Sequence, residues 1–199
     1  MKWLILVLVF VLASCSEDAL DPLRSGDVVV AFGDSLTAGK GVVQDKAYPA
    51  VLSRLIGYPV VNAGISGETT AEGLQRLPDV LERENPALLI LFEGGNDILR
   101  NQDLAKTKSN LEAMIQMARE REIEVVMVGL PRKQLFSNTA ELYTQLADQY
   151  ELPLQDNIVA SLLRKPAMKS DNVHFNQDGY AALAGALAKL LKEEGALTD

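Results

Sequence analysis

Two residue types that often build reactive sites are nearly absent from this chain of 199 residues, which has one cysteine and one histidine. A single cysteine, Cys15, cannot form a disulfide within the chain. Metal sites commonly draw several ligands from histidine and cysteine, so the composition argues against a bound metal ion. The glycine-containing stretch 64–70 also lacks the Gly-Lys-Ser/Thr ending of a phosphate-binding loop. We therefore expect no metal ion, nucleotide or other cofactor.

Positive charge is also scarce. Lysine and arginine together number 19, against 27 aspartate and glutamate residues, and the formal net charge is −8. A protein that binds nucleic acid presents a basic face to the phosphates, so this balance argues against nucleic acid as a partner. It also argues against strong electrostatic adhesion to anionic lipids.

The third missing feature is an apolar run long enough to span a bilayer, which takes about 20 residues. The run Trp3–Ala13 is shorter than that. Lys2 precedes it and Ser14-Cys15 follow it, which is the pattern of a signal peptide. The end of the segment, Leu12-Ala13-Ser14-Cys15, resembles the bacterial lipobox, in which the cysteine is lipidated and becomes the first residue of the mature protein. An ordinary signal peptide with an incidental cysteine is the alternative interpretation.

These features divide the chain into three parts. We expect residues 1–14 to be a signal peptide of the lipoprotein type, residues 15–26 to be a lipidated cysteine with a short polar tether, and residues 27–199 to be one domain. Ser16 stands where an inner-membrane retention signal would usually have aspartate. By analogy with enterobacterial sorting, this favours the cell envelope, with a lipid anchor in the outer membrane facing the periplasm. The sequence carries no indication of an oligomeric state.

Apolar segments alternate with amphipathic segments along residues 27–199. Near-continuous apolar runs are typical of strands buried on both faces, and they predict strands at 28–32, 60–62, 87–92, 124–129 and 152–155. Apolar residues at helical spacing predict helices at 48–56, 70–83, 104–122, 139–150 and 177–193, the last capped by Asn176. Strands that alternate with helices predict a three-layer α/β/α sandwich around a parallel sheet.

Three of these strands are followed by small polar motifs. Gly33-Asp34-Ser35-Leu36 comes after the first strand, Asn62-Ala63-Gly64 belongs to the end of the second, and Gly94-Gly95-Asn96-Asp97 comes after the third. The carboxyl ends of parallel strands lie along one edge of a sheet, where ligands bind, so these motifs should meet there. Each motif by itself has an ordinary turn composition. Their common placement is what indicates a site.

The single histidine, His174, lies in the sequence Asp171-Asn172-Val173-His174. A lone histidine is most often structural, but a serine nucleophile needs a base that works near neutral pH, and histidine suits that task. Ser35 would then be the nucleophile and His174 the base, while Asp171 would hold the imidazole in one tautomer. The chain order Ser, Asp, His is one of several in which this geometry is known.

Together the motifs resemble the four blocks of the SGNH (GDSL-type) hydrolase family, and in particular its bacterial arylesterases, lysophospholipases and acyl-thioesterases. The similarity extends from Val28 to Leu191, and the matching residues are Gly33-Asp34-Ser35-Leu36, Gly64, Gly95-Asn96-Asp97 and Asp171-x-x-His174.

The resemblance implies a five-stranded sheet in the order 2-1-3-4-5. It also implies an oxyanion hole that is formed by the backbone N–H groups of Ser35 and Gly64 and by the side-chain amide of Asn96. Where the family commonly has proline after the histidine, this chain has Phe175, which could narrow an acyl groove. Further candidates for the wall of that groove are Ile98, Leu99 and Phe136, although the same side chains could equally be packing residues.

The activity implied by the resemblance is that of a serine esterase that hydrolyses short to medium acyl esters or thioesters. Its partners would be a small acyl substrate and, through the lipid anchor, the membrane. A carbohydrate O-acetylesterase of the cell envelope is the alternative. A non-catalytic lipoprotein that binds an envelope partner is a third hypothesis, and the intact set of motif residues argues against it.

Overall fold

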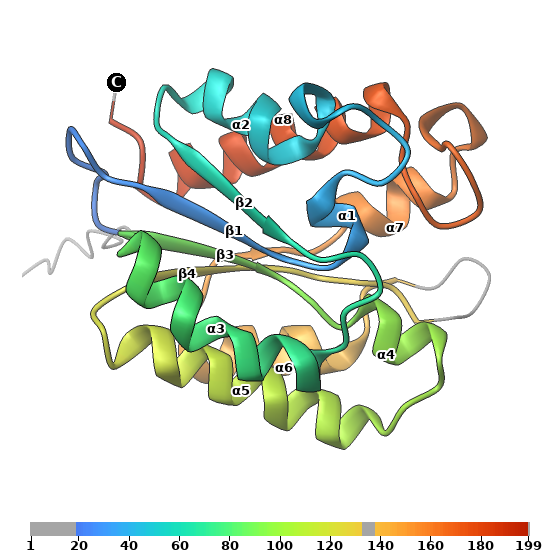
Figure 1. The fold of residues 1–199 in the computed structure, drawn as a ribbon, viewed down its shortest axis with the longest axis horizontal. Helices are drawn as coiled ribbons and strands as arrows, with labels where there is room; N and C mark the ends of the chain where they lie inside the picture. Colours follow the sequence, from blue (N-terminus) through green and yellow to red (C-terminus); the bar gives the residue numbers. More distant parts are fainter. Residues whose placement is uncertain (1–18, 133–137, 199) are drawn as a thin grey trace, which may run out of the picture.

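Five parallel strands form the central sheet of the computed structural model, which describes residues 19–132 and 138–198 (Figure 1). Their order across the sheet is β2-β1-β3-β4-β5, as the family resemblance implies. The chain thus moves outward from β1 to the edge strand β2, crosses to the other side with β3, and continues to β5. The strands are Val29–Gly33 (β1), Val60–Gly64 (β2), Leu88–Phe92 (β3), Glu124–Val128 (β4) and Leu154–Gln155 (β5).

Helices cover both faces of this sheet (Figure 1). α2 and α8 pack against each other on one face, while α3, α5 and α6 cover the other. The predicted three-layer α/β/α sandwich is therefore confirmed. The helices are Ser35–Ala38 (α1), Tyr48–Ile56 (α2), Thr70–Glu84 (α3), Gly95–Leu99 (α4), Leu104–Arg119 (α5), Glu141–Tyr150 (α6), Ile158–Leu163 (α7) and Gln177–Glu193 (α8).

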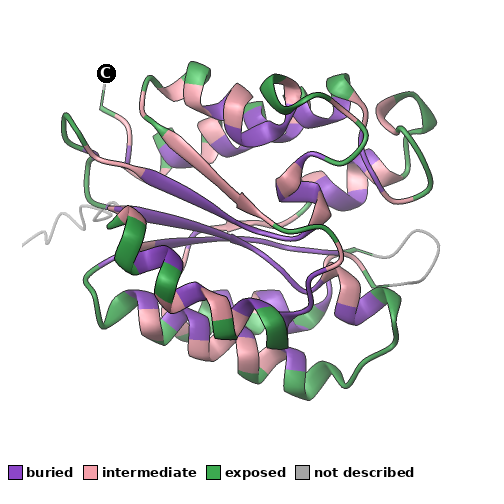
Figure 2. Ribbon diagram, in the orientation of Figure 1, coloured by how far each residue is buried: buried purple, intermediate pink, exposed green. Residues whose placement is uncertain are grey.

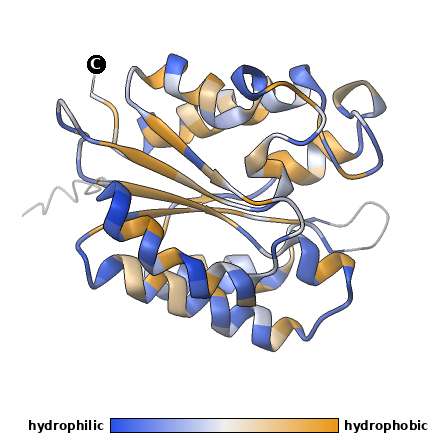
Figure 3. Cartoon of the chain, viewed as in Figure 1, coloured by the Kyte–Doolittle hydropathy of each residue, from blue (hydrophilic) through white to orange (hydrophobic). Residues whose placement is uncertain are grey.

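The central strands are buried along their whole length. Every residue of β1 and β3 is buried, and these strands are largely purple in Figure 2. Figure 3 shows hydrophobic colour on the same strands and hydrophilic colour on much of the surrounding helices. Helices on both faces exclude water from the sheet, so its strands need no alternation of polar and apolar residues. This is why continuous apolar runs predicted them.

Two side-chain caps define where α3 and α8 begin. At α3, the Glu72 carboxylate accepts a hydrogen bond from the backbone N–H of Thr69 at 2.9 Å, as part of a capping box. At α8, the Asn176 side chain accepts from the backbone N–H of Gly179 at 3.0 Å, which confirms the predicted cap. These bonds satisfy backbone donors that the first turn of a helix leaves unpaired.

Three short helices were not predicted from the sequence. α1 has four residues, α4 has five and α7 has six, and segments this short show no readable 3.6-residue repeat. α1 begins at the end of β1 because the Asp34 side chain accepts from the backbone N–H of Leu36 at 2.9 Å. The motif after β1 is therefore the start of a helix and not an open turn.

Residues 19–26, the described part of the segment before β1, differ from the polar tether expected for residues 15–26. Leu20 and Leu23 are buried, with only 3% and 8% of their surface exposed. Their backbone N–H groups donate to the carbonyl oxygens of Glu194 and Ala196 at 2.9 Å each. The two leucines give the segment an apolar side, which is more stable when packed on the domain than when exposed to water. The folded domain therefore begins before residue 27.

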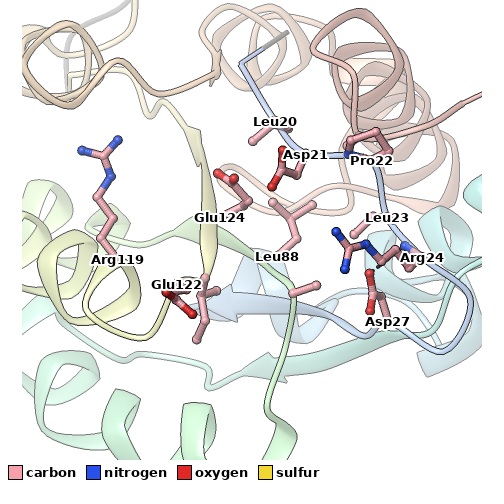
Figure 4. A pocket seen from close by; sticks show the side chains of 13 residues that line it. Leu20, Asp21, Pro22, Leu23, Arg24, Asp27, Leu88, Arg119, Glu122 and Glu124 are labelled. Atoms are coloured by element: carbon pink, nitrogen blue, oxygen red, sulfur yellow. Dashed lines mark hydrogen bonds between the residues drawn. The ribbon is translucent and has the colours of Figure 1, made fainter.

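This segment borders a cavity of about 670 Å³ where β3 and β4 begin (Figure 4). Charged side chains surround the cavity, with Arg24 and Asp27 on one side and Arg119, Glu122 and Glu124 on the other. This is the amino edge of the parallel sheet, opposite the edge at which the strands end. None of the motif residues lines this cavity.

The part of the chain that the structure describes contains no helix long and apolar enough to cross a membrane. Within residues 19–132 and 138–198, no three His, Cys, Asp or Glu side chains are grouped so that they could hold a metal ion. The expected signal peptide, Cys15 and Phe136 lie outside the described residues. The statements about them therefore stay predictions.

Candidate active site

Ser35, Asn96 and His174 lie together at the carboxyl edge of the sheet. Ser35 is the first residue of α1, directly after β1, and Asn96 lies in α4, just past β3. His174 lies in the loop before α8. All three line one cavity. The neighbouring parallel strands β1 and β3 end at the same edge, which is why Ser35 and Asn96 meet here.

A continuous chain of hydrogen bonds joins Ser35, His174 and Asp171. Ser35 Oγ lies 3.0 Å from His174 Nε2, and His174 Nδ1 lies 2.7 Å from Asp171 Oδ2. The other carboxylate oxygen, Asp171 Oδ1, accepts from the backbone N–H groups of Val173 and His174 at 2.9 Å each. The imidazole is mostly buried, whereas the carboxylate of Asp171 is half-exposed. The ring of His174 is thus held on both sides.

The bonds to Asp171 determine how the imidazole can act. The backbone N–H of Val173, together with the ring and backbone of His174, lowers the pKa of Asp171 to about 2. Asp171 is therefore a carboxylate at neutral pH, and as an acceptor it favours the tautomer with the proton on Nδ1. Nε2 then presents its lone pair to the Ser35 hydroxyl, which is the arrangement that general base catalysis needs.

Phe175 anchors the loop that carries His174 and does not line the cavity. This corrects the expectation that it narrows an acyl groove. Its side chain is fully buried and meets Tyr180 of α8 edge to face, with ring centroids 5.6 Å apart. Phe175 pairs with Lys169 in an isolated antiparallel bridge. Adjacent side chains of an extended segment point to opposite sides, so His174 reaches the site while Phe175 points into the core.

The side-chain amide of Asn96 is held by the loop that follows β2. Its Nδ2 donates to the backbone carbonyl of Glu68 at 2.8 Å and lies 3.4 Å from Asp34 Oδ2. A Cβ at Gly95 would lie 2.6 Å from the same Asp34 oxygen, and Gly94 has a φ of 104°. Gly94 requires glycine because of its positive φ, and Gly95 requires glycine because a Cβ would come too close to Asp34.

Gly64 offers no free N–H group, which corrects the expected oxyanion hole. Its N–H donates to Asn62 Oδ1 at 3.0 Å. A Cβ at Gly64 would lie 2.2 Å from the backbone nitrogen of Ala38. The glycine is therefore needed for the close packing of β2 against α1.

Gly67 is a candidate that sequence reasoning missed. It adopts a φ of +89°, and in residues 19–132 and 138–198 its N–H has no hydrogen-bond partner. It directly precedes Glu68, the residue whose carbonyl holds Asn96. The stretch Gly64-Ile65-Ser66-Gly67 offers two glycines, and the hydrogen bonds of the folded chain decide which N–H remains free.

The cavity beside Ser35 has a volume of about 280 Å³ and a mostly apolar wall. Ile98 and Leu99, two of the side chains expected at an acyl groove, line it. Other elements add Leu130, Pro131, Leu163 and Val173 to the apolar wall. Ser35 and His174 thus line a small, mostly apolar cavity.

Residues 31–182 match the GDSL-like Lipase/Acylhydrolase family. The chain belongs to this family. The matched region is more than half of the chain and includes the Ser35, Asn96 and His174 motifs. The prediction of an ester hydrolase of the GDSL/SGNH type is therefore confirmed.

Several members of the GDSL-like family are similar to this chain over most of its length. Thioesterase 1/protease 1/lysophospholipase L1 of Escherichia coli (strain K12) is 31% identical over 176 residues, which cover 84% of this chain and 85% of the relative. An arylesterase of Vibrio mimicus is 29% identical over 201 residues, which cover 96% and 97%. The crystal structure of TesA has a TM-score of 0.76 and 29% sequence identity, and the match covers 84% of this chain and 99% of that one.

Proposed function

We propose that this protein is a serine esterase that hydrolyses short to medium acyl esters or thioesters by way of an acyl-enzyme. The observation that carries the proposal is the hydrogen-bonded chain of Ser35, His174 and Asp171 beside an apolar cavity. A serine hydroxyl is a weak nucleophile that needs an adjacent base. The distance of 3.0 Å puts that base within reach of the proton it has to take.

In the first half-reaction, Ser35 Oγ attacks the acyl carbon and its proton passes to His174 Nε2. Asp171 stabilises the imidazolium that forms. The bond to the leaving oxygen or sulfur then breaks, and Nε2 gives the proton to the departing alcohol or thiol. In the second half-reaction, a water molecule gives a proton to Nε2 while its oxygen attacks the acyl carbon. The bond to Ser35 Oγ breaks, the proton returns to Oγ, and the carboxylic acid leaves.

The oxyanion of each tetrahedral intermediate needs preset hydrogen-bond donors. We assign this role to the N–H of Ser35, the N–H of Gly67 and the amide of Asn96. In the described part of the chain, the first two N–H groups have no partner. Asn96 holds Glu68 with one hydrogen, and its long 3.4 Å contact to Asp34 is one that an oxyanion can replace.

A structure with a phosphonate attached to Ser35 Oγ tests the glycine donor. We expect a phosphoryl oxygen within hydrogen-bond distance of the backbone nitrogen of Gly67. A contact with the nitrogen of Gly64, together with loss of the bond to Asn62, would reverse the assignment.

The size and the wall of the cavity support single acyl chains of short to medium length. Its volume of about 280 Å³ is just below the roughly 300–1,000 Å³ range of small-molecule pockets. A methylene that is fully buried contributes about 0.8 kcal/mol, and one that extends past the cavity contributes little. Two relatives are named for thioesterase, lysophospholipase and arylesterase activities, which agrees with this substrate class.

A series of p-nitrophenyl esters of increasing acyl length, run beside acyl thioesters and acetylated xylan, tests the proposal. The ratio kcat/KM should rise over the first few carbons and then level or fall, and Ser35→Ala should lose the activity. A steady rise to long chains would contradict the short-chain proposal. Release of acetate from the polysaccharide, with negligible hydrolysis of simple esters, would favour the carbohydrate O-acetylesterase.

For location, we propose a lipid anchor on Cys15 in the cell envelope, facing the periplasm. The lipobox-like sequence before Cys15 supports it. Five residues from Cys15 to Leu20 reach at most about 18 Å. Leu20 packs at the amino edge of the sheet, and Ser35 lies at the opposite edge. An anchor there would turn the site away from the membrane, which agrees with substrates that arrive from the aqueous side.

A further inference from the structure

A buried carboxyl group behind the candidate active site has no role in the mechanism above. Glu93 follows β3 and is fully buried. Its Oε2 accepts from the backbone N–H of Gly94 at 3.1 Å. Its Oε1 is buried and has no hydrogen-bond partner among the described residues. Leaving a buried polar atom unpaired is costly, so the native protein must satisfy Oε1 in some other way.

Glu68 is the neighbour that can satisfy it. Glu68 is also buried, and its carboxyl group interacts with that of Glu93, which raises the pKa of Glu93. Two ionised carboxylates repel each other, whereas one shared proton turns the same contact into a strong hydrogen bond. A proton on Glu93 would therefore give the buried Oε1 a hydrogen-bond acceptor in Glu68.

The Glu68 end of this contact is firmly held. Arg76 donates to the two Glu68 carboxylate oxygens at 2.8 and 2.6 Å. The same guanidinium donates to the carbonyl of Ala63 at 3.0 Å and lies 4.1 Å from the ring centroid of Phe32. The backbone carbonyl of Glu68 accepts from Asn96 Nδ2. A line of contacts thus runs from Glu93, through Glu68, to the amide proposed to stabilise the oxyanion.

We propose that Glu93 is a positioning residue: it carries a proton on Oε1, donates it to the Glu68 carboxylate, and so fixes the loop that holds Asn96. The proposal rests on the proposed function, because the role of Asn96 is part of it. Glu93 does not touch the substrate or the reacting atoms.

The charges around Glu93 favour the protonated form. Burial, first, and the nearby Asp34 and Glu68 raise the pKa of Glu93 well above its ordinary value. Burial likewise raises the pKa of Asp34 to about 6. Among the described residues, Asp97 from α4, Tyr143 from α6 and Arg76 from α3 also face this cluster, and Arg76 brings a positive charge to it. A proton on Glu93 therefore avoids another negative charge in a site with little positive charge.

Deprotonation of Glu93 at high pH should weaken the oxyanion site. Loss of the proton would place a second charge against Glu68 and remove the hydrogen bond between the two carboxyl groups. The Glu68 carbonyl would then hold Asn96 less firmly, and kcat should fall while KM changes little. A carboxamide at position 93 can donate to Glu68 at every pH, so it should preserve the contact and abolish the alkaline loss.

The test compares Glu93→Gln, Glu93→Ala and wild type, with Glu124→Gln at the amino edge of the sheet as the control for loss of a carboxylate. Glu93→Gln should keep most of kcat, and its pH profile should lack the alkaline decline. Glu93→Ala should lower kcat by about 10- to 100-fold. This loss is no larger than the loss expected when an oxyanion donor itself is removed. Glu124→Gln should follow the wild-type profile. Equal losses in Glu93→Gln and Glu93→Ala, with an unchanged pH profile, would overturn the proposal.

Thermal unfolding gives a second readout that does not depend on activity. A carboxyl group whose pKa is raised by folding loses its stabilising effect as the pH rises towards the folded-state value. The unfolding midpoint of Glu93→Gln, relative to wild type, should therefore rise as the pH is raised above the ordinary glutamate value of 4.5. A difference that does not depend on pH would refute the proton on Glu93. An active Ser35→Ala variant would instead refute the serine mechanism, so the two failures can be told apart.

Discussion

Ser35 Oγ and His174 Nε2 lie 3.0 Å apart, although 139 positions separate the two residues in the chain. The end of β1 and the short helix α1 hold Ser35, while the burial of Phe175 and the cap of α8 hold the loop of His174. The contact therefore depends on the packing of two layers of the fold, and not on local sequence.

Replacing either partner of this contact should remove nearly all ester hydrolysis. Because Ser35 and His174 act as one unit, the double variant Ser35→Ala/His174→Ala should be scarcely less active than either single variant. The measurement is kcat on p-nitrophenyl acetate with purified, folded proteins. Wild-type kcat in Ser35→Ala would rule out the serine mechanism.

Asn96→Ala should lower kcat by about 10²- to 10³-fold, with a smaller change in KM, because one oxyanion donor typically contributes that much. Asn96→Asp should be at least as harmful, since a carboxylate beside Asp34 would repel the developing oxyanion. Steady-state kinetics on a short ester measure both variants. An unchanged kcat in Asn96→Ala would remove this residue from the site.

Asp171→Asn should lower kcat by roughly 10⁴-fold, because an amide can hold the imidazole in the wrong tautomer. The variant should also change the acid stability. Folding lowers the pKa of Asp171 from 3.8 to about 2, so its contribution to stability is present above the unfolded-state value and is lost as the pH falls through the folded one. Between about pH 4 and about pH 2, the unfolding midpoint should therefore fall more steeply in wild type than in Asp171→Asn. Parallel slopes would contradict a lowered pKa of Asp171 in the folded protein.

Phe175→Ala should destabilise the protein by about 3–5 kcal/mol, the usual cost of truncating a buried phenylalanine. It should also lower kcat, because the loop that positions His174 loses its anchor. Chemical denaturation and kinetics on the same preparation test both effects. Phe175→Leu, which keeps an apolar side chain of similar reach, serves as the control and should be milder in both. A Phe175→Ala variant that only changed the preference for acyl length would restore the groove-wall interpretation.

Cys15 should carry acyl chains in protein made by its bacterial host, with residues 1–14 absent and the protein in the membrane fraction. Cys15→Ala should lack the lipid, whereas Ser35→Ala, matched for its small change, should keep it. Mass spectrometry of the mature amino terminus shows whether Cys15 carries the lipid in each variant. An unmodified thiol on Cys15 would refute the anchor.

Much of this protein follows from the sequence alone. Continuous apolar runs identify the buried strands, because a sheet covered on both faces has no polar side, and the spacing of apolar residues identifies the longer helices. Ser35 and Asn96 could be predicted to share a site because the ends of parallel strands share an edge, and His174 could be added because a serine nucleophile needs a base. Short elements such as α1 and α4 escape this reasoning, since one turn of helix has no periodicity to read.

The rest depends on contacts between segments that are far apart in the chain. Gly64 and Gly67 cannot be told apart as donors from the sequence. In the structure the N–H of Gly64 donates to Asn62, while that of Gly67 has no partner in the described residues. Phe175 follows His174 directly, yet it points into the core because adjacent side chains of an extended segment face opposite sides. Leu20 and Leu23 could be placed only with the C-terminal residues they pack beside. Local sequence determines the elements, and the direction of each donor and side chain is set by what the folded chain places next to it.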